Sequence, residues 1–155
     1  MLPAPTPHLS RRAALAATAL LLALALLPWS ANRGDTREAI APLLSTGKTV
    51  LGQTLSYPVG APAKVTAAII TMQPGEETGW HKHDVPLFGL MLEGELSVDY
   101  GAEGTRVYRK GEALLEAIGV AHNGRNTGAG EARILAVFMG ADGVPDTVLV
   151  KAPGQ

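Results

Sequence analysis

Residues 75–94 read GEETGWHKHDVPLFGLMLEG. This stretch contains His81 and His83, which lie two positions apart in the chain. Successive side chains of a β-strand point to opposite faces, so residues two apart share a face. If the stretch is extended, both imidazoles can reach the same point in space. The pattern indicates either a pair of metal ligands or a pair of hydrogen-bonded core histidines.

A second stretch supplies another histidine. Residues 111–126 read GEALLEAIGVAHNGRN and contain His122. The chain has four histidines, and the fourth, His8, lies in an amino-terminal segment that we expect to be outside the folded domain. There is no cysteine, which excludes disulfides, thiolate metal ligands and cysteine nucleophiles. Every histidine of the expected domain therefore falls in one of these two stretches.

The two stretches resemble the two signature motifs of the cupin superfamily. The first motif is G-x5-H-x-H-x3–4-E-x6-G, and the chain matches it at Gly75, His81, His83 and Gly94. The second motif is G-x5-P-x-G-x2-H-x3-N, and the chain matches it at Gly111, Gly119, His122 and Asn126. The chain departs from the motifs at two positions, since Leu87 stands in place of the glutamate and Ala117 in place of the proline.

The resemblance implies an all-β fold, a single barrel of the cupin type (double-stranded β-helix, jelly-roll-like) over residues 48–155. It also implies that His81, His83 and His122 hold one metal ion inside the barrel. Three neutral imidazoles suit a divalent transition metal such as iron, manganese, nickel, copper or zinc. Because Leu87 brings no negative charge, the ion would keep close to its full charge and favour an anionic ligand in an open position. The sequence identifies no catalytic residue and no site for an organic cofactor.

The strand after the histidine pair predicts the lining of the site. If the register holds from His83 onward, Leu87, Gly89 and Met91 point towards the metal, with room beside Gly89. Such a lining suits a small, largely apolar ligand or substrate with one chelating head. Glu116 in the second motif could be a replacement acid or base near the metal, or could face solvent on an edge strand.

Short apolar runs separated by glycine turns predict many strands. We expect strands at residues 48–57, 64–72, 79–83, 86–92, 95–100, 105–109, 112–117, 132–139 and 147–150, and a loop at residues 123–131. Phe88, Leu90 and Leu92 form an apolar row on the face opposite the predicted site. Either another sheet of the same chain covers this row, or a partner covers it in a homodimer, as the resemblance to small cupins implies.

Residues 1–31 have the pattern of an export signal. Arg11 and Arg12 precede a run of alanine and leucine with one threonine at residues 13–27, and Pro28, Trp29, Ser30 and Ala31 follow. The pattern predicts a signal peptide and a periplasmic protein. The alternative is an apolar leader helix that stays in the inner membrane as an anchor. Residues 32–47 are expected to form a linker with a short helix that ends near Leu44.

The net charge of the chain indicates whether nucleic acid is an expected partner. The chain has 13 basic and 14 acidic residues, and Arg11 and Arg12 are the only basic ones in residues 1–31, which leaves 11 basic against 14 acidic and a net charge of −3. No basic stripe with interleaved aromatic residues occurs, so we expect no nucleic-acid partner.

Two functions fit these observations. One is an exported metal-dependent oxidoreductase, a dioxygenase-like enzyme acting on a small chelating compound. The other is a non-catalytic envelope module that binds a metal or a small ligand.

Overall fold

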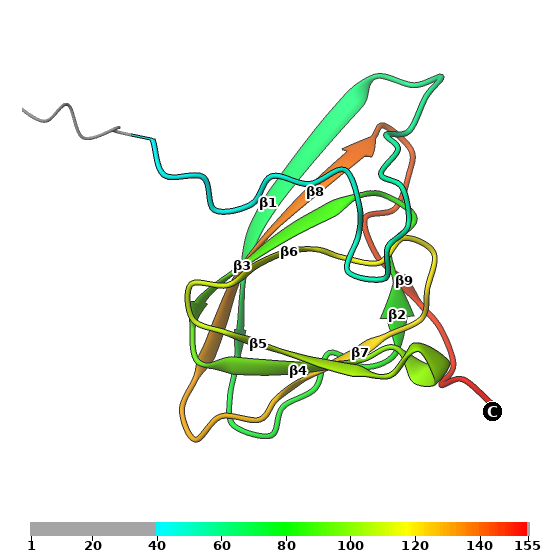
Figure 1. Ribbon diagram of the computed structural model, residues 1–155. Helices are drawn as coiled ribbons and strands as arrows, with labels where there is room; N and C mark the ends of the chain where they lie inside the picture. The colour runs from blue at the N-terminus through cyan, green and yellow to red at the C-terminus, as the bar shows by residue number, and fades with distance from the viewer. Residues whose placement is uncertain (1–39, 155) are drawn as a thin grey trace, which may run out of the picture. The chain divides into compact units, whose positions relative to one another are not determined.

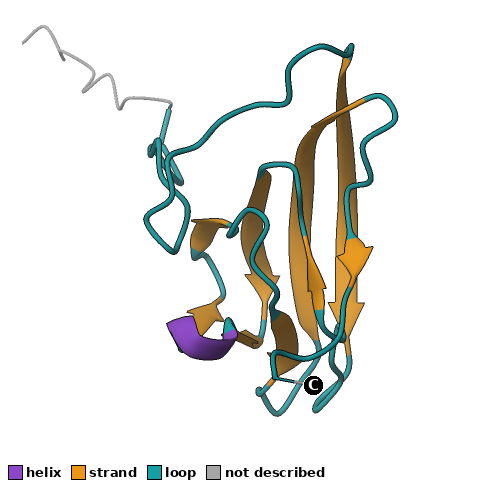
Figure 2. Ribbon diagram, turned by 90° about the vertical axis from the view of Figure 1, so that its right-hand side faces the viewer, coloured by secondary structure: helices purple, strands orange, loops and turns teal. Residues whose placement is uncertain are grey.

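A computed structural model describes residues 40–154, and the folded unit begins at Ala41. Strands make up nearly all of its regular structure, and a single helical turn follows the fourth strand (Figure 2). The elements are β1 (Ala63–Met72), β2 (His81–Lys82), β3 (Leu87–Glu93), β4 (Glu95–Asp99), η1 (Gly101–Glu103), β5 (Thr105–Arg109), β6 (Ala113–Leu115), β7 (Asn123–Asn126), β8 (Ala132–Ala141) and β9 (Val148–Leu149). The predicted all-β fold class is therefore confirmed for this unit.

The strands form three antiparallel sheets. The largest has the order β1-β8-β3-β6, a second has the order β5-β4-β7, and β2 pairs with β9. Figure 1 shows the two larger sheets as opposite walls, with β2 and β9 at one side between them. One face of each of the two larger sheets therefore lines the interior of the barrel.

Alternation along the strands separates the core from the surface. In β3, Leu87, Gly89 and Met91 are buried, whereas Phe88, Leu90 and Leu92 are half-buried on the other face. Two groups of buried apolar residues fill the interior: Met72, Met91, Leu96, Val98, Tyr100, Ala117, Ala132 and Ile134 form one, and Val85, Leu87, Ala136 and Phe138 form the other. Burying each large apolar side chain stabilises the fold by about 1.5–3 kcal/mol.

The outer face of the largest sheet is partly covered by the chain itself. A groove there is lined by Leu44, Leu55 and Tyr57 on one side and by Phe88, Val137 and Met139 of the sheet on the other. The predicted apolar row is thus covered near Phe88 by the loop preceding β1 rather than by another sheet. Further along the same face, Val65 and Ile69 of β1 are exposed. The homodimer stays a prediction.

Residues 48–57 form a tight loop, and the predicted strand there is wrong. One isolated bridge joins Lys48 to Thr54, and Thr49 N donates a hydrogen bond of 2.9 Å to Gln53 O. Gly52 has a φ of 79°, which turns the chain back on itself. The apolar residues of this segment do not alternate, so no face favours extension. The side-chain amide of Gln53 instead binds both backbone polar groups of Ile118, at 2.8 and 3.0 Å.

The segment Asn123–Asn126 is the strand β7, although we predicted a loop. Asparagine and glycine have low strand propensity, but this segment pairs with β4 along its whole length. Asn126 is 1% exposed, and its amide donates to Met72 O at 2.9 Å and to Gly130 O at 2.8 Å. Tertiary hydrogen bonds therefore override local propensity here.

The predicted signal peptide or anchor, residues 1–31, lies outside the described residues. So does most of the predicted short helix, and its described part, residues 40–44, is irregular. Within residues 40–154, none of the helical structure is long and apolar enough to span a membrane. Export, cleavage of the leader and periplasmic location stay predictions.

Two motif glycines differ in what surrounds them, and this difference is testable. Gly94 has a φ of 76°, and a Cβ atom there would lie 2.6 Å from Glu131 O and 2.8 Å from the Ala132 Cα. Gly111 has a φ of 88° but nothing within 4 Å of such a Cβ. We expect Gly111→Ala to lower the free energy of unfolding by about 1–2 kcal/mol through its left-handed backbone. Gly94→Ala should lose a further 1–3 kcal/mol, approximately, through the clash. Urea denaturation measures both, and equal losses would contradict the contact at Gly94.

Candidate metal centre

Two backbone segments bring three histidines together. His81 begins β2, His83 follows that strand, and His122 immediately precedes β7. His81 N donates to His122 O at 3.0 Å, and His122 N donates to His81 O at 2.8 Å. Gly119 N donates to His83 O at 2.7 Å. Main-chain hydrogen bonds therefore fix the backbone position of each histidine, independently of the contacts of its side chain.

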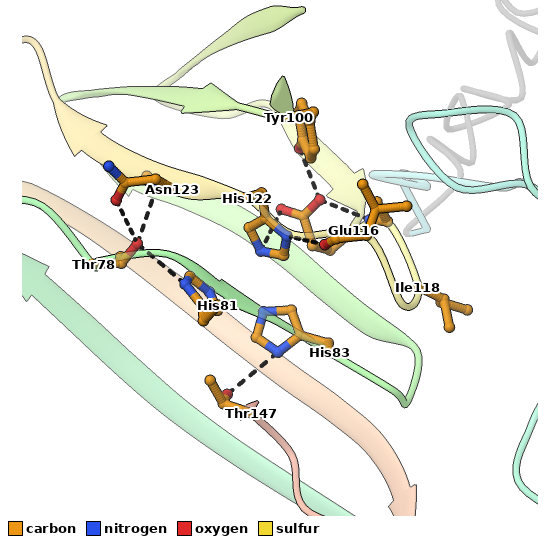
Figure 3. A network of polar contacts seen from close by, with 12 residues as sticks. Thr78, His81, His83, Tyr100, Glu116, Ile118, His122, Asn123 and Thr147 are labelled. Carbon is orange, nitrogen blue, oxygen red and sulfur yellow. Dashed lines mark hydrogen bonds and ion pairs between the residues drawn. The ribbon is translucent and has the colours of Figure 1, made fainter. Parts of the chain in front are cut away.

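The three imidazoles converge on one point inside the barrel. His81, His83 and His122 are 8%, 4% and 2% exposed, and one ring nitrogen from each lies within 4.8 Å of the others. Figure 3 shows the three rings turned towards one another. Lys82, between the first two, points the other way and forms an ion pair of 2.9 Å with Asp84. The period of two therefore holds at this pair, and the three histidines are placed to bind a metal ion.

Main-chain carbonyl groups orient all three rings. The Nδ1 atom of His81 lies 2.8 Å from Gly79 O, that of His83 lies 2.8 Å from Asp146 O, and that of His122 lies 2.9 Å from Val120 O. A carbonyl oxygen only accepts hydrogen bonds, so we assign the proton of each ring to Nδ1. Each Nε2 atom then keeps its lone pair. This is the arrangement of metal-binding histidines, whose other ring nitrogen donates to a fixed acceptor.

Burial favours the neutral form of these rings. Desolvation lowers the pKa of His81 and of His122, in each case against the backbone hydrogen bond to the ring, which raises it. Desolvation, together with the neighbouring histidines, lowers the pKa of His83 to about 4, against the backbone hydrogen bond from its ring to Asp146, which raises it. Neutral imidazole is the form that binds a metal ion. The site is therefore in its ligand form at neutral pH.

Glu116 is buried beside this cluster. It is 6% exposed, so the alternative that it faces solvent on an edge strand is wrong. Its Oε1 atom accepts hydrogen bonds from the Tyr100 hydroxyl at 2.8 Å and from Ala117 N at 2.7 Å. Its Oε2 atom lies 4.0 Å from His122 Nε2. Desolvation raises the pKa of Glu116, while the two hydrogen bonds oppose that rise.

A cavity of about 70 Å³ adjoins the histidines, and its lining is almost entirely apolar. Of the residues predicted to line the site, Leu87, Gly89 and Glu116 do so. Met91 does not belong to this lining but packs in the interior group that contains Ile134. The space expected beside Gly89 is filled, because a Cβ atom there would lie 3.0 Å from the Leu114 Cδ2 atom.

A second hollow, of about 190 Å³, shares Ile70, Thr78, His81, His83 and Leu87 with the first. It extends to Thr147 and to Leu149, which is 78% exposed. Two threonine hydroxyls lie near the histidine rings on this side, with Thr78 Oγ1 3.4 Å from His81 Nδ1 and Thr147 Oγ1 3.3 Å from His83 Nδ1. The histidines can therefore be approached from the side of β9.

Sequence reasoning missed three polar residues of the site. Tyr100 could have been found, because it shares a predicted strand face with Leu96 and Val98. Thr78 and Thr147 carry no comparable signal. Thr147 approaches His83 from the last segment of the chain, and only the pairing of β2 with β9 brings it there.

Comparisons with known proteins agree with this geometry. The family model described as the Cupin domain matches residues 68–138, which contain all three histidines and Glu116. A search of curated protein sequences finds no match. One similar structure is an uncharacterized conserved protein with a double-stranded β-helix domain from Klebsiella pneumoniae subsp. pneumoniae. It has 16% identity and a TM-score of 0.50, over 77% of this chain and 98% of that chain.

Two of the similar structures carry the names of enzymes. The DMSP lyase DddQ from Ruegeria pomeroyi has 22% identity and a TM-score of 0.50 over 59% of this chain. The oxalate decarboxylase from Lactobacillus farciminis, as its formate complex, has 22% identity and a TM-score of 0.49 over 56% of this chain. The chain covers only 45% of the lyase and 26% of the decarboxylase. At 22% identity the likeness to the lyase is one of fold.

The low pKa of His83 makes stability depend on pH in the metal-free protein. In the folded chain His83 stays neutral until the pH falls to about 4, whereas in the unfolded chain it binds a proton near about pH 6.5. Between these values the unfolded state binds more protons, so stability falls as the pH falls. Lowering the pH from 7.5 to 5 should therefore cost the parent chain about 2 kcal/mol more than His83→Asn.

Urea denaturation in the presence of a chelator measures this difference. The asparagine amide can still donate to Asp146 O, so the variant keeps the orienting hydrogen bond without the titration. Glu116, whose pKa is shifted in the opposite direction, is common to both chains and does not affect the comparison. Equal losses of stability in the two chains would contradict the shift at His83.

Proposed function

Because this chain belongs to the cupin superfamily, we propose that it binds one divalent transition-metal ion through His81, His83 and His122. The observation that carries this proposal is the set of three Nδ1 hydrogen bonds to main-chain carbonyl oxygens, which leaves the Nε2 lone pairs to an ion in a cluster whose ligand nitrogens lie within 4.8 Å of one another. The donor set suits iron, manganese, nickel, copper or zinc. Such an ion supplies a Lewis acid and, for every one of these metals except zinc, a redox centre.

We propose that the chain acts as a metal-dependent oxygenase on a small chelating compound. The lining supports a substrate with a compact apolar body, because side chains such as Leu87, Ile134 and Ala136 form most of the wall. These side chains exclude water from the cavity, and they hold the apolar body by contact alone. The neutral imidazoles bring no charge, so an anionic or polarised head of the substrate would be favoured next to the ion.

The second candidate is a non-catalytic module of the cell envelope that binds a metal or a small ligand. The scarcity of acid–base groups favours it, since Glu116 is the one carboxyl group among the described residues that line the cavity. The lyase and decarboxylase activities in the names of the similar structures belong to those proteins, because the likeness to them is one of fold.

Metal binding is tested first, by melting temperature. The full chain, freed of metal by a chelator, should melt at a higher temperature when Fe(II), Mn(II), Ni(II), Cu(II) or Zn(II) is added. An ion present at about 100 times its Kd stabilises the folded state by about 2.7 kcal/mol. His81→Ala, His83→Ala and His122→Ala should each remove the shift. Lys82→Ala, the control between the first two histidines, should keep it. If none of the five ions changes the melting temperature of the parent chain, the proposed function fails.

Oxygen consumption separates the two candidate functions. The full chain is loaded with Fe(II) and mixed with a panel of thiols, diketones and phenols, which are small compounds with a chelating head. Consumption of oxygen that requires both Fe(II) and one of these compounds, and that His83→Ala abolishes, supports the oxygenase. A chain that binds the metal tightly but consumes no oxygen with any member of the panel supports the binding module.

A further inference from the structure

Glu116 lies next to Leu87 across the sheet. Glu116 N donates a hydrogen bond of 2.9 Å to Leu87 O, just beyond the paired residues of β3 and β6. Leu87 occupies the place at which the first cupin motif has its glutamate. Both side chains line the cavity that adjoins the histidines. A carboxyl group is therefore available to the site from the neighbouring strand, one hydrogen bond away from the position where the motif carries it.

The carboxyl group of Glu116 is held at one oxygen only. Its Oε1 atom accepts from the Tyr100 hydroxyl and from Ala117 N, at 2.8 and 2.7 Å. The hydroxyl of Tyr108 lies 3.3 Å from that of Tyr100 and so supports this anchor. The contact recorded for Oε2 is with His122 Nε2, at 4.0 Å (Figure 3). The anchor leaves Oε2 directed at the histidine cluster.

The contact between Glu116 and His122 joins two acceptor atoms. His122 carries its proton on Nδ1, which faces Val120 O at 2.9 Å, so Nε2 presents a lone pair. A carboxylate oxygen and an imidazole lone pair do not attract each other directly, whereas a cation bound to both stabilises the pair. Two atoms that each bind one ion at about 2.1 Å lie at most about 4.2 Å apart. The separation of 4.0 Å falls within this limit.

The geometry points to Glu116 as a fourth protein ligand of the metal ion, contributing Oε2 beside the three Nε2 atoms and replacing the carboxylate that Leu87 lacks. This inference rests on the proposed metal binding and specifies its ligand set. A carboxylate ligand removes one unit of charge from the site. The three-histidine site expected from the sequence would thus become a site of three histidines and one glutamate, drawn from a different strand.

The test compares metal affinities in the full chain. The Kd for Zn(II) and for Co(II) is measured by competition with a chelator at pH 7.5, together with the visible absorption spectrum of the Co(II) form. Glu116→Gln keeps the size of the side chain and the Oε1 acceptor but removes the charge of Oε2. We expect it to weaken binding by at least about 100-fold, more than the loss of a typical outer partner of a ligand, and to change the Co(II) spectrum.

Three further variants separate a ligand from a structural residue. Glu112→Gln, the same change at an exposed position of the same motif, should alter the Kd by less than about threefold. Tyr100→Phe should weaken binding by about tenfold, because Ala117 N still holds the carboxylate. Adding Leu87→Glu to Glu116→Gln should recover at least about tenfold of the lost affinity by returning a carboxylate to the neighbouring position.

Two outcomes would overturn the inference. If Glu116→Gln changes neither the Kd nor the Co(II) spectrum while His83→Ala loses the metal, Glu116 is not a ligand and the three-histidine site stands. If the parent chain binds neither Zn(II) nor Co(II), and Fe(II), Mn(II), Ni(II) and Cu(II) also leave its melting temperature unchanged, the proposed metal binding fails and this inference fails with it. Melting temperatures of the metal-free variants show that each chain is folded before its affinity is compared.

Discussion

The site depends on one reciprocal pair of main-chain hydrogen bonds, between His81 and His122. This pair is an isolated antiparallel bridge between the first residue of β2 and the residue before β7, and it joins the first motif to the second. Residues directly opposite each other in an antiparallel pair project to the same side. The bridge therefore sets both imidazoles on the interior side of the barrel, and the period of two adds His83. The hydrogen bond from Gly119 N to His83 O holds the third histidine in the same arrangement.

The apolar interior disfavours charge on the buried side chains of the site. Burial lowers the pKa of the three imidazoles and raises that of Glu116, which means that the apolar surroundings disfavour the charged form of every one of these groups. A divalent ion reverses this for the carboxyl group, because it stabilises a negative charge next to it. Since the three histidines are assembled only in the folded chain, the free energy of binding an ion there would also stabilise the fold.

The pairing of His81 with His83 could be predicted from their spacing of two, whereas His122 was added to the predicted site by the resemblance to the second cupin motif. The lining could be predicted only near the histidines. Met91 shares a strand face with Leu87, but four residues of strand span about 13 Å, so Met91 reaches the core instead of the cavity. The filling of the space beside Gly89 by Leu114 depends on the pairing of β3 with β6, which no local pattern shows. The strand β7 has the composition of a loop and is extended because β4 pairs with it.

The three imidazoles are oriented by the carbonyl groups of Gly79, Val120 and Asp146, all of which belong to the main chain. A main-chain carbonyl group is retained when the side chain of its residue is substituted. The orientation of the rings therefore does not depend on the identity of these three residues, provided that the backbone conformation is unchanged. The rest of the wall can then change in size and polarity while the rings remain as they are. In a scaffold of this kind, the histidine cluster and the substrate preference can evolve separately. Substitutions in the wall of the cavity can change specificity without altering the histidines.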